Sequence, residues 1–193
     1  KSGLPLIGGD PHRGLDVPNV YYQNHLACDE FDVIGMSFPG SPGFPHFGHN
    51  RNVAWCVTHA MSDYQDLYIE KFNLNDTSQY EYEGKWLTAQ IIPDTIKVRE
   101  SHDRSIELVS TIHGPIISGK PADGKAIAIK YTALEPDNKN AESIRSMLSV
   151  ENVDQMDACM KDWVDPCNNF VFADVQGSIR YLNRGKIPIR PEQ

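Results

Sequence analysis

Apolar and polar side chains alternate with the short period of β-strands over much of the chain. Residues 20–38 are rich in β-branched and aromatic side chains and predict two or three strands joined by tight loops. Residues 52–60 are mostly apolar, which favours a strand buried on both faces. Residues 66–74 alternate, and we expect them to form a strand beside the preceding one. Further strands are predicted within 81–100, 105–118 and 125–134, the first two as an antiparallel pair.

The period changes near residue 140. Apolar residues recur at three- and four-residue spacing within 140–150 and again within 152–164, which predicts two helices. Asn152 is expected to cap the second helix. Residues 168–185 predict a hairpin, because Gly177 can take the positive φ of a tight turn. The sequence therefore predicts an α+β fold class, β-rich with a late helical pair.

Composition and charge narrow the possible functions. The chain of 193 residues is 40% hydrophobic and 23% charged, with a formal net charge of -8. Nucleic-acid binding depends on a basic surface, so no nucleic-acid partner is expected. No apolar run approaches the length of about 18 residues that a transmembrane helix needs, so we expect no membrane span. Nothing marks a linker, and residues 1–193 are predicted to form a single domain.

The four cysteines, at positions 28, 56, 159 and 167, do not have the spacing of a zinc or redox site. Cys56 lies in the middle of a predicted strand, which favours a free buried thiol. Cys159 and Cys167 are close enough in sequence to bridge in an oxidising compartment. Cysteine usage alone leaves the compartment open.

The seven histidines give no ready-made catalytic motif. No pair has the HExxH spacing of a zinc site, and the chain contains no GxSxG nucleophile elbow. His25, His102 and His113 are interpreted as hydrogen-bonded structural groups. Asp63 and Asp66 form a close acidic pair, which is either a solvated turn or part of a site for a hard cation such as calcium.

Four blocks of sequence resemble a known family. They are GGDPH (8–12), FGHNRNVAWCVTHAMSDYQDLY (47–68), TIHGPII (111–117) and FVFADVQGSIRYL (170–182). In order and spacing they resemble the penicillin acylase (penicillin amidase) family of N-terminal-nucleophile hydrolases, across nearly the whole chain. The resemblance implies that the chain forms part of an αββα sandwich and belongs to an enzyme that cleaves N-acyl amide bonds, as in penicillins or acyl-homoserine lactones.

Such enzymes resemble one another in mechanism. Autoproteolysis frees a β chain whose first residue, Ser, supplies both the nucleophilic hydroxyl and, through its α-amino group, the base. An α-amino group has a pKa near 8, so part of it is neutral at working pH. Because the first residue here is Lys1, the resemblance implies an N-terminally truncated piece of a β chain. We expect the nucleophile upstream of Lys1, an oxyanion-binding Asn downstream of Gln193, and no activity from this piece alone.

Individual positions carry implied roles. His12 matches the residue that contacts and orients the nucleophile, and His59 matches the residue whose backbone N–H lines the oxyanion hole. The implied acyl pocket comprises His46, Phe47, Val57 and Asn168. Polar His46 and Asn168, with Arg13, stand where benzylpenicillin-cleaving relatives have apolar or aromatic residues. The substrate is therefore expected to differ from benzylpenicillin.

The resemblance also bears on cofactors, partners and location. Asp63, Gln65 (through its carbonyl) and Asp66 match a calcium loop, and no organic cofactor is implied. The expected partners are a small acyl amide and an α chain from the same precursor, in the periplasm or secreted. The alternative is a fold relative without catalysis that binds a ligand or calcium, and the presence of the upstream Ser would discriminate the two.

Overall fold

The computed structural model describes residues 3–190. Lys1, on which the expected position of the nucleophile depends, lies outside these residues. The chain forms two compact units: unit 1 comprises residues 1–64 and 135–193, and unit 2 comprises residues 65–134. The expectation of a single domain concerns independent folding of the chain and stays a prediction.

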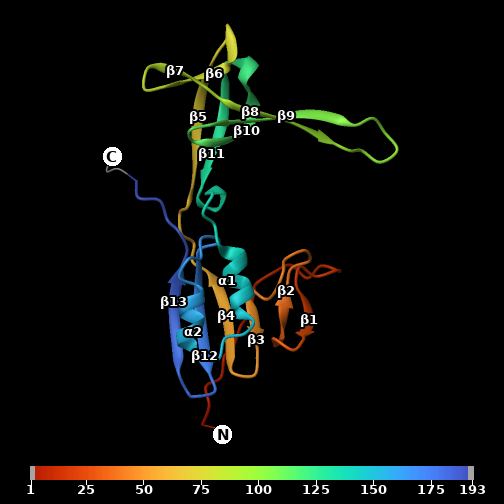
Figure 1. The fold of residues 1–193 in the computed structure, drawn as a ribbon, viewed down its shortest axis with the longest axis vertical. Coiled ribbons are helices and arrows are strands. Elements are labelled where there is room, and N and C mark those ends of the chain that lie inside the picture. Colours follow the sequence, from red (N-terminus) through yellow and green to blue (C-terminus); the bar gives the residue numbers. More distant parts are fainter. Residues whose placement is uncertain (1–2, 191–193) are drawn as a thin grey trace. The chain divides into compact units, whose positions relative to one another are not determined.

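Unit 1 is built on a six-stranded antiparallel sheet in the order β1-β2-β3-β4-β12-β13 (Figure 1). The segment 20–38 forms two of its strands, as predicted, and 168–185 forms the predicted hairpin, with Gly177 at a φ of 97°. The strands are β1 (Tyr22–Ala27), β2 (Asp32–Ser37), β3 (Phe47–His49), β4 (Val53–His59), β12 (Asn168–Asp174) and β13 (Ile179–Arg184).

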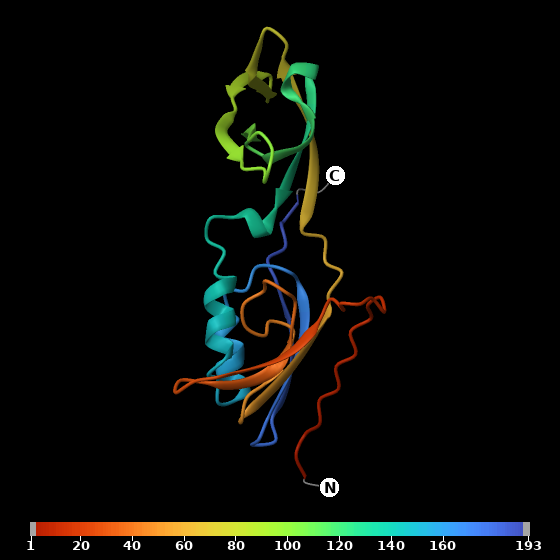
Figure 2. The ribbon, with the colours of Figure 1, turned by 90° about the vertical axis from the view of Figure 1, so that its right-hand side faces the viewer.

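Two helices, α1 (Asn140–Met147) and α2 (Val153–Cys159), cover one face of this sheet (Figure 2). Both are shorter than predicted, because apolar residues that follow each helix reach the core from turns. Asn152 caps α2 as expected: its Oδ1 accepts the N–H of Gln155 at 2.9 Å. The carboxylate of Asp174, at the end of β12, accepts the N–H of Val153 at 3.1 Å, which ties the β12–β13 turn to the start of α2.

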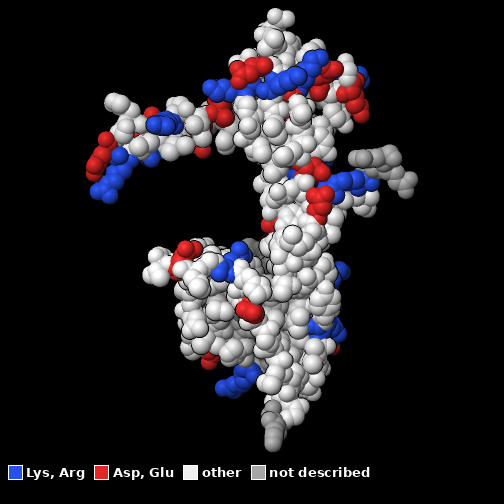
Figure 3. Space-filling model, turned by 180° about the vertical axis from the view of Figure 1, so that it is seen from behind, with Lys and Arg blue, Asp and Glu red and all other residues white. Residues whose placement is uncertain are grey.

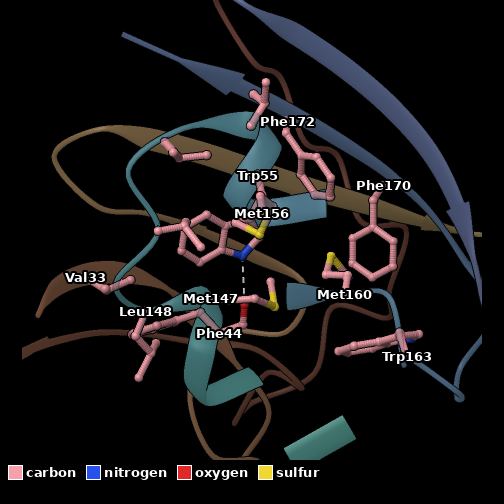
Figure 4. Close-up of a cluster of buried hydrophobic side chains, with 13 residues drawn as sticks. Val33, Phe44, Trp55, Met147, Leu148, Met156, Met160, Trp163, Phe170 and Phe172 are labelled. Carbon is pink, nitrogen blue, oxygen red and sulfur yellow. Dashed lines mark hydrogen bonds between the residues drawn. The ribbon is translucent and has the colours of Figure 1, made fainter. Parts of the chain in front are cut away.

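The core of unit 1 lies between the helices and the sheet. Trp55, Phe170 and Phe172 point from β4 and β12 towards Met147 and Met156 of the helices (Figure 4). The indole N–H of Trp55 donates to the carbonyl of Phe44 at 2.8 Å, so this buried polar group is satisfied. In β4 burial is greatest from Val53 to Cys56, while Thr58 and His59 are exposed. The prediction of a strand buried on both faces therefore fails at its C-terminal end, where the candidate site begins.

Unit 2 is a seven-stranded antiparallel sheet in the order β7-β6-β5-β11-β10-β9-β8. Residues 66–73 lie in β5 and Leu74 lies in the turn that follows; β5 pairs with β11 and β6, so the prediction that this strand neighbours residues 52–60 is wrong. The predicted pairing of 81–100 with 105–118 is present as β8 against β9. The elements are β5 (Gln65–Asn73), β6 (Asp76–Tyr82), β7 (Lys85–Thr88), β8 (Gln90–Ile96), β9 (Arg104–Thr111), β10 (Gly114–Lys120) and β11 (Lys125–Tyr131), with short 3-10 turns at Pro121–Asp123 and Thr132–Leu134.

A buried carboxylate is the main polar feature of unit 2. Glu70, 2% exposed, accepts from the hydroxyl of Thr111 at 2.5 Å and pairs with Nδ1 of His113 at 2.8 Å. The His113 ring stacks on Tyr68 with centroids 3.9 Å apart. A buried charge needs such partners. The interpretation of His113 as a hydrogen-bonded structural group is confirmed.

The visible surface (Figure 3) carries charges of both signs, and the cysteines are reduced. On the face in view in Figure 3, Lys and Arg side chains are interspersed with Asp and Glu side chains. Within residues 3–190, no helix is long and apolar enough to cross a membrane. All four cysteines are free thiols, so Cys159 and Cys167 do not bridge in this structure, and Cys56 is the buried free thiol that was predicted.

Candidate active site

A pocket of about 310 Å³ in unit 1 is lined by every residue of this chain to which the sequence assigned a catalytic or acyl-binding role. These residues come from distant parts of the chain, since more than 150 positions separate the first from the last. The predicted residues that line it are His12, Arg13, His46, Phe47, Val57, His59 and Asn168, and they are joined by Asp10, Pro11, Tyr21, Thr58 and Pro166.

The sheet register explains how these residues meet. Strand β4 pairs with β12 so that His59 lies opposite Asn168, and Val57 lies opposite Phe170. His46 and Phe47 stand at the start of β3, on the other side of β4. The pocket thus forms where β3 begins, β4 ends and β12 begins.

The main chain of His59 faces the open side of β4. Ala60 donates its N–H to the carbonyl of Cys167 at 3.0 Å, so His59 and Asn168 form a pair without hydrogen bonds to each other. In an antiparallel ladder the N–H groups of such a pair point away from the partner strand. The N–H of His59 therefore points to the β3 side, and β3 pairs with β4 only near Trp55 and Ala54. This orientation leaves the N–H available to a group bound in the pocket.

His46 is held neutral inside an aromatic cluster. Its Nδ1 lies 3.1 Å from the hydroxyl of Tyr21, and its ring meets Phe38 edge-on with centroids 4.9 Å apart. Burial, reinforced by the positive charge of Arg13, lowers the pKa of His46 from 6.5 to about 4. At neutral pH the pocket therefore contains an uncharged imidazole, and the positive charge comes from Arg13, whose guanidinium lies over the Phe38 ring at 5.8 Å.

Asn168 adds a buried amide to the pocket wall. The residue is 2% exposed, and its Nδ2 has no hydrogen-bond partner among the described residues. A buried donor without a partner costs about 1–3 kcal/mol. The amide nitrogen of Asn168 is therefore a donor in the pocket wall that no described residue satisfies.

A family model described as Penicillin amidase matches residues 1–193. The chain belongs to the penicillin amidase family. The fold of the chain agrees with this assignment: a solved structure of thermostable penicillin G acylase from Alcaligenes faecalis matches with a TM-score of 0.74 and 28% identity, over 90% of this chain and 31% of that chain. The predicted fold class, a β-rich part of the N-terminal-nucleophile sandwich with a late helical pair, is confirmed.

Curated relatives agree with the family. Penicillin acylase 2 proenzyme of Pseudomonas sp. (strain SE83) is 39% identical over 192 residues, which are 100% of this chain and 25% of that protein. Acyl-homoserine lactone acylase QuiP of Pseudomonas fluorescens (strain Pf0-1) is 25% identical over 196 residues, with 100% and 24% covered. The chain spans about a quarter of the length of these relatives. Both are named as acylases, so this penicillin amidase chain belongs to a family of acylase-type hydrolases.

The expected metal ligands of this penicillin amidase chain lie outside the pocket. A carboxylate oxygen of Asp63 pairs with Arg190 at 3.2 Å, and the main-chain carbonyl of Asp63 accepts from the same guanidinium at 3.3 Å. Gln65 and Asp66 open β5, opposite Tyr131 and Lys130. Within residues 3–190, no group of three or more His, Cys, Asp or Glu side chains is arranged to hold a metal ion.

Sequence reasoning missed the aromatic wall that supports His46. Tyr21 stacks on Phe38 with centroids 4.4 Å apart and meets Phe47 edge-on at 5.4 Å. Tyr21 directly precedes β1 and Phe38 directly follows β2, and neither forms a sequence motif with any pocket residue. The available signal was indirect: aromatic residues at strand ends, followed by a Gly- and Pro-rich loop that leads to His46.

Proposed function

We propose that the protein to which this chain belongs hydrolyses N-acyl amide bonds, and that the unit 1 pocket holds the acyl group. One observation carries the proposal: the residues with implied acyl-binding and oxyanion roles line a single pocket. Its wall combines apolar Phe47 and Val57 with the polar groups of His46 and Asn168. Such a mixture of apolar surface and a few placed polar groups is usual for small-molecule sites.

The proposed reaction uses an N-terminal Ser that is not among these 193 residues. Its Oγ attacks the acyl carbonyl carbon while its α-amino group takes the hydroxyl proton, directly or through one water. The N–H of His59 donates to the oxygen that becomes negative in the tetrahedral intermediate. The intermediate collapses, the leaving amine takes the proton, and a water then releases the acid from the acyl-enzyme. His12, which is exposed at the pocket rim, is proposed to orient the nucleophile.

The remaining parts of the proposal concern the whole protein. We propose that autoproteolysis of a precursor yields an α chain that is the partner of the β chain, and that the protein acts in the periplasm or outside the cell. The name proenzyme of the Pseudomonas relative supports the processing step. Residues 1–193 alone, without the Ser, are proposed to be inactive.

The test is an assay of the full precursor against a panel of chromogenic acyl amides, with mass spectrometry to follow self-cleavage. We expect the precursor to cleave itself and the product to hydrolyse at least one amide. A precursor that stays intact and hydrolyses none would overturn the proposal and favour a binding protein without catalysis.

We further propose that Asp63, the carbonyl of Gln65 and Asp66 contribute to a calcium site. Their oxygen donors suit a hard cation, which would neutralise the two carboxylates. Arg190 already neutralises Asp63, so calcium has to compete with it. We expect calcium to raise the melting temperature of the processed protein, Arg190→Gln to increase that rise, and Asp63→Ala with Asp66→Ala to abolish it. The metal site would be contradicted if calcium and a chelator gave the same melting temperature, both in wild type and in Arg190→Gln.

A further inference from the structure

The imidazole of His59 binds the loop that follows β4. The N–H of Met61 donates to Nδ1 at 3.2 Å, and Nε2 lies 3.0 Å from the hydroxyl of Tyr64. Because Nδ1 accepts an N–H, the neutral ring carries its proton on Nε2, which donates to Tyr64. Both ring nitrogens therefore have partners within the loop.

The bond from Met61 closes a tight turn directly after the strand. An acceptor two residues before the N–H is the arrangement that Asn and Asp side chains form in Asx-turns. Met61 has a φ of 55°, in the left-handed region, which costs a residue with a Cβ about 1 kcal/mol or more. The contact with His59 helps to hold this conformation and so fixes where β4 ends.

The turn and the sheet together hold the main chain of His59. On one side, the bond from Ala60 to Cys167 ties the strand end to β12. On the side of β3, the paired residues of β4 are Trp55 and Ala54, so no described residue of β3 pairs with His59. The side-chain turn therefore adds a second restraint, beside the bond from Ala60 to Cys167, on the segment just after the N–H that faces the pocket.

We propose that the His59 imidazole is a positioning residue: it closes the turn at residues 59–61 and thereby aims its own main-chain N–H at the oxyanion. This inference rests on the proposed function. An error of about 1 Å in the position of a catalytic group can cost on the order of 10²-fold in rate. Loss of the turn should therefore lower kcat and leave KM nearly unchanged, because the N–H is used most in the transition state.

Two variants in the processed protein separate positioning from chemistry. His59→Asn retains an acceptor that can close the same turn but has no imidazole, whereas His59→Leu has neither. We expect kcat of His59→Leu to fall about 10- to 100-fold, and His59→Asn, which restores the acceptor, to recover most of that loss. Hydrogen exchange of the Met61 amide should be fast in His59→Leu and slow in wild type and His59→Asn.

Each result decides a different point. If kcat of His59→Leu equals that of wild type, the inference is overturned. It is also overturned if His59→Asn is as slow as His59→Leu, because the imidazole itself would then be required. If wild type hydrolyses no amide, the proposed function fails, and the exchange of Met61 still tests the turn. Equal Met61 exchange in the three proteins would refute the turn whatever the activity. Self-cleavage and melting temperature show whether each variant is folded.

Discussion

At the scale of single residues, Asn168 and His46 give the pocket its chemistry. Asn168 contributes an amide nitrogen that has no hydrogen-bond partner within residues 3–190, and His46 contributes a ring whose pKa is lowered to about 4 by burial and by Arg13. The family resemblance of the sequence implied that both lie in the acyl pocket, because each lies in or beside a recognisable block. It could not show their protonation state or bonding, which depend on Tyr21, Phe38 and Arg13 brought in by the fold.

Asn168→Leu should change which acyl groups are accepted. Leu has the same branched arrangement of side-chain heavy atoms but is larger and lacks the donor, so an acyl chain with an acceptor oxygen loses its partner. We expect kcat/KM for such an amide to fall about tenfold relative to its hydrocarbon isostere. The measurement is the ratio of the two kcat/KM values, with Asn169→Leu as the matched neighbour on β12. An equal loss for both substrates would show that Asn168 serves packing alone.

The lowered pKa of the His46 imidazole follows from its surroundings. Its folded pKa, about 4, lies below the ordinary value of 6.5, so the unfolded chain takes up a proton that the folded chain lacks as pH falls between these values. The contribution of His46 to stability is therefore full above pH 6.5 and declines below it. An NMR titration of the ring, with His46→Gln to assign the signal, should show a neutral imidazole at pH 5.5. A measured pKa near 6.5 would contradict the burial of this ring beside Arg13.

At the scale of elements, local pattern predicted the strands, the two helices and the Asn152 cap, because periodicity and capping are local properties. Local pattern did not predict which strands pair with each other. Residues 66–74 were expected beside 52–60, but they pair with 125–131, some 60 positions later. Alternation tells which side chains share a face and says nothing about which strand supplies the hydrogen bonds. The block TIHGPII is a second case in which the neighbouring strand could not be predicted. Its Gly114 has a φ of 122°, and a Cβ there would lie 2.1 Å from the carbonyl oxygen of Ile129 in β11. Glycine is therefore needed there because β11 is close.

The junction of β12, β13 and α2 depends on one carboxylate. Burial raises the pKa of Asp174, but the N–H groups of Val153, Ser178 and Gln176 donate to its carboxylate and outweigh burial, so its pKa is lowered. Asp174→Ala leaves these donors unpaired, whereas Asn152→Ala removes only the helix cap, at a cost of about 1 kcal/mol. We therefore expect Asp174→Ala to lower the melting temperature more than Asn152→Ala, with Asn152→Asp as the control that keeps the cap. The opposite order would show that Asp174 does not hold this junction.

At the scale of the whole molecule, the chain leaves unit 1 after Tyr64 and returns at Glu135. The sequence did not indicate this division, because both units are built from strands of the same period and no Gly- or Pro-rich linker marks the boundary. The pocket lies wholly in unit 1 and joins segments on both sides of the excursion. Its composition was predictable from the family blocks, while the orientation of the His59 N–H required the register of three strands.

The most direct test of the account is the kinetic effect of removing that N–H. His59→Pro deletes it on the open side of β4, where proline is tolerated in a strand, and His59→Asn is the matched control that keeps it. In the processed protein we predict that kcat for an acyl amide falls about 10²- to 10³-fold in His59→Pro, with KM little changed. Equal kcat values for folded, processed His59→Pro and His59→Asn would contradict the central claim that this pocket binds the reacting acyl group.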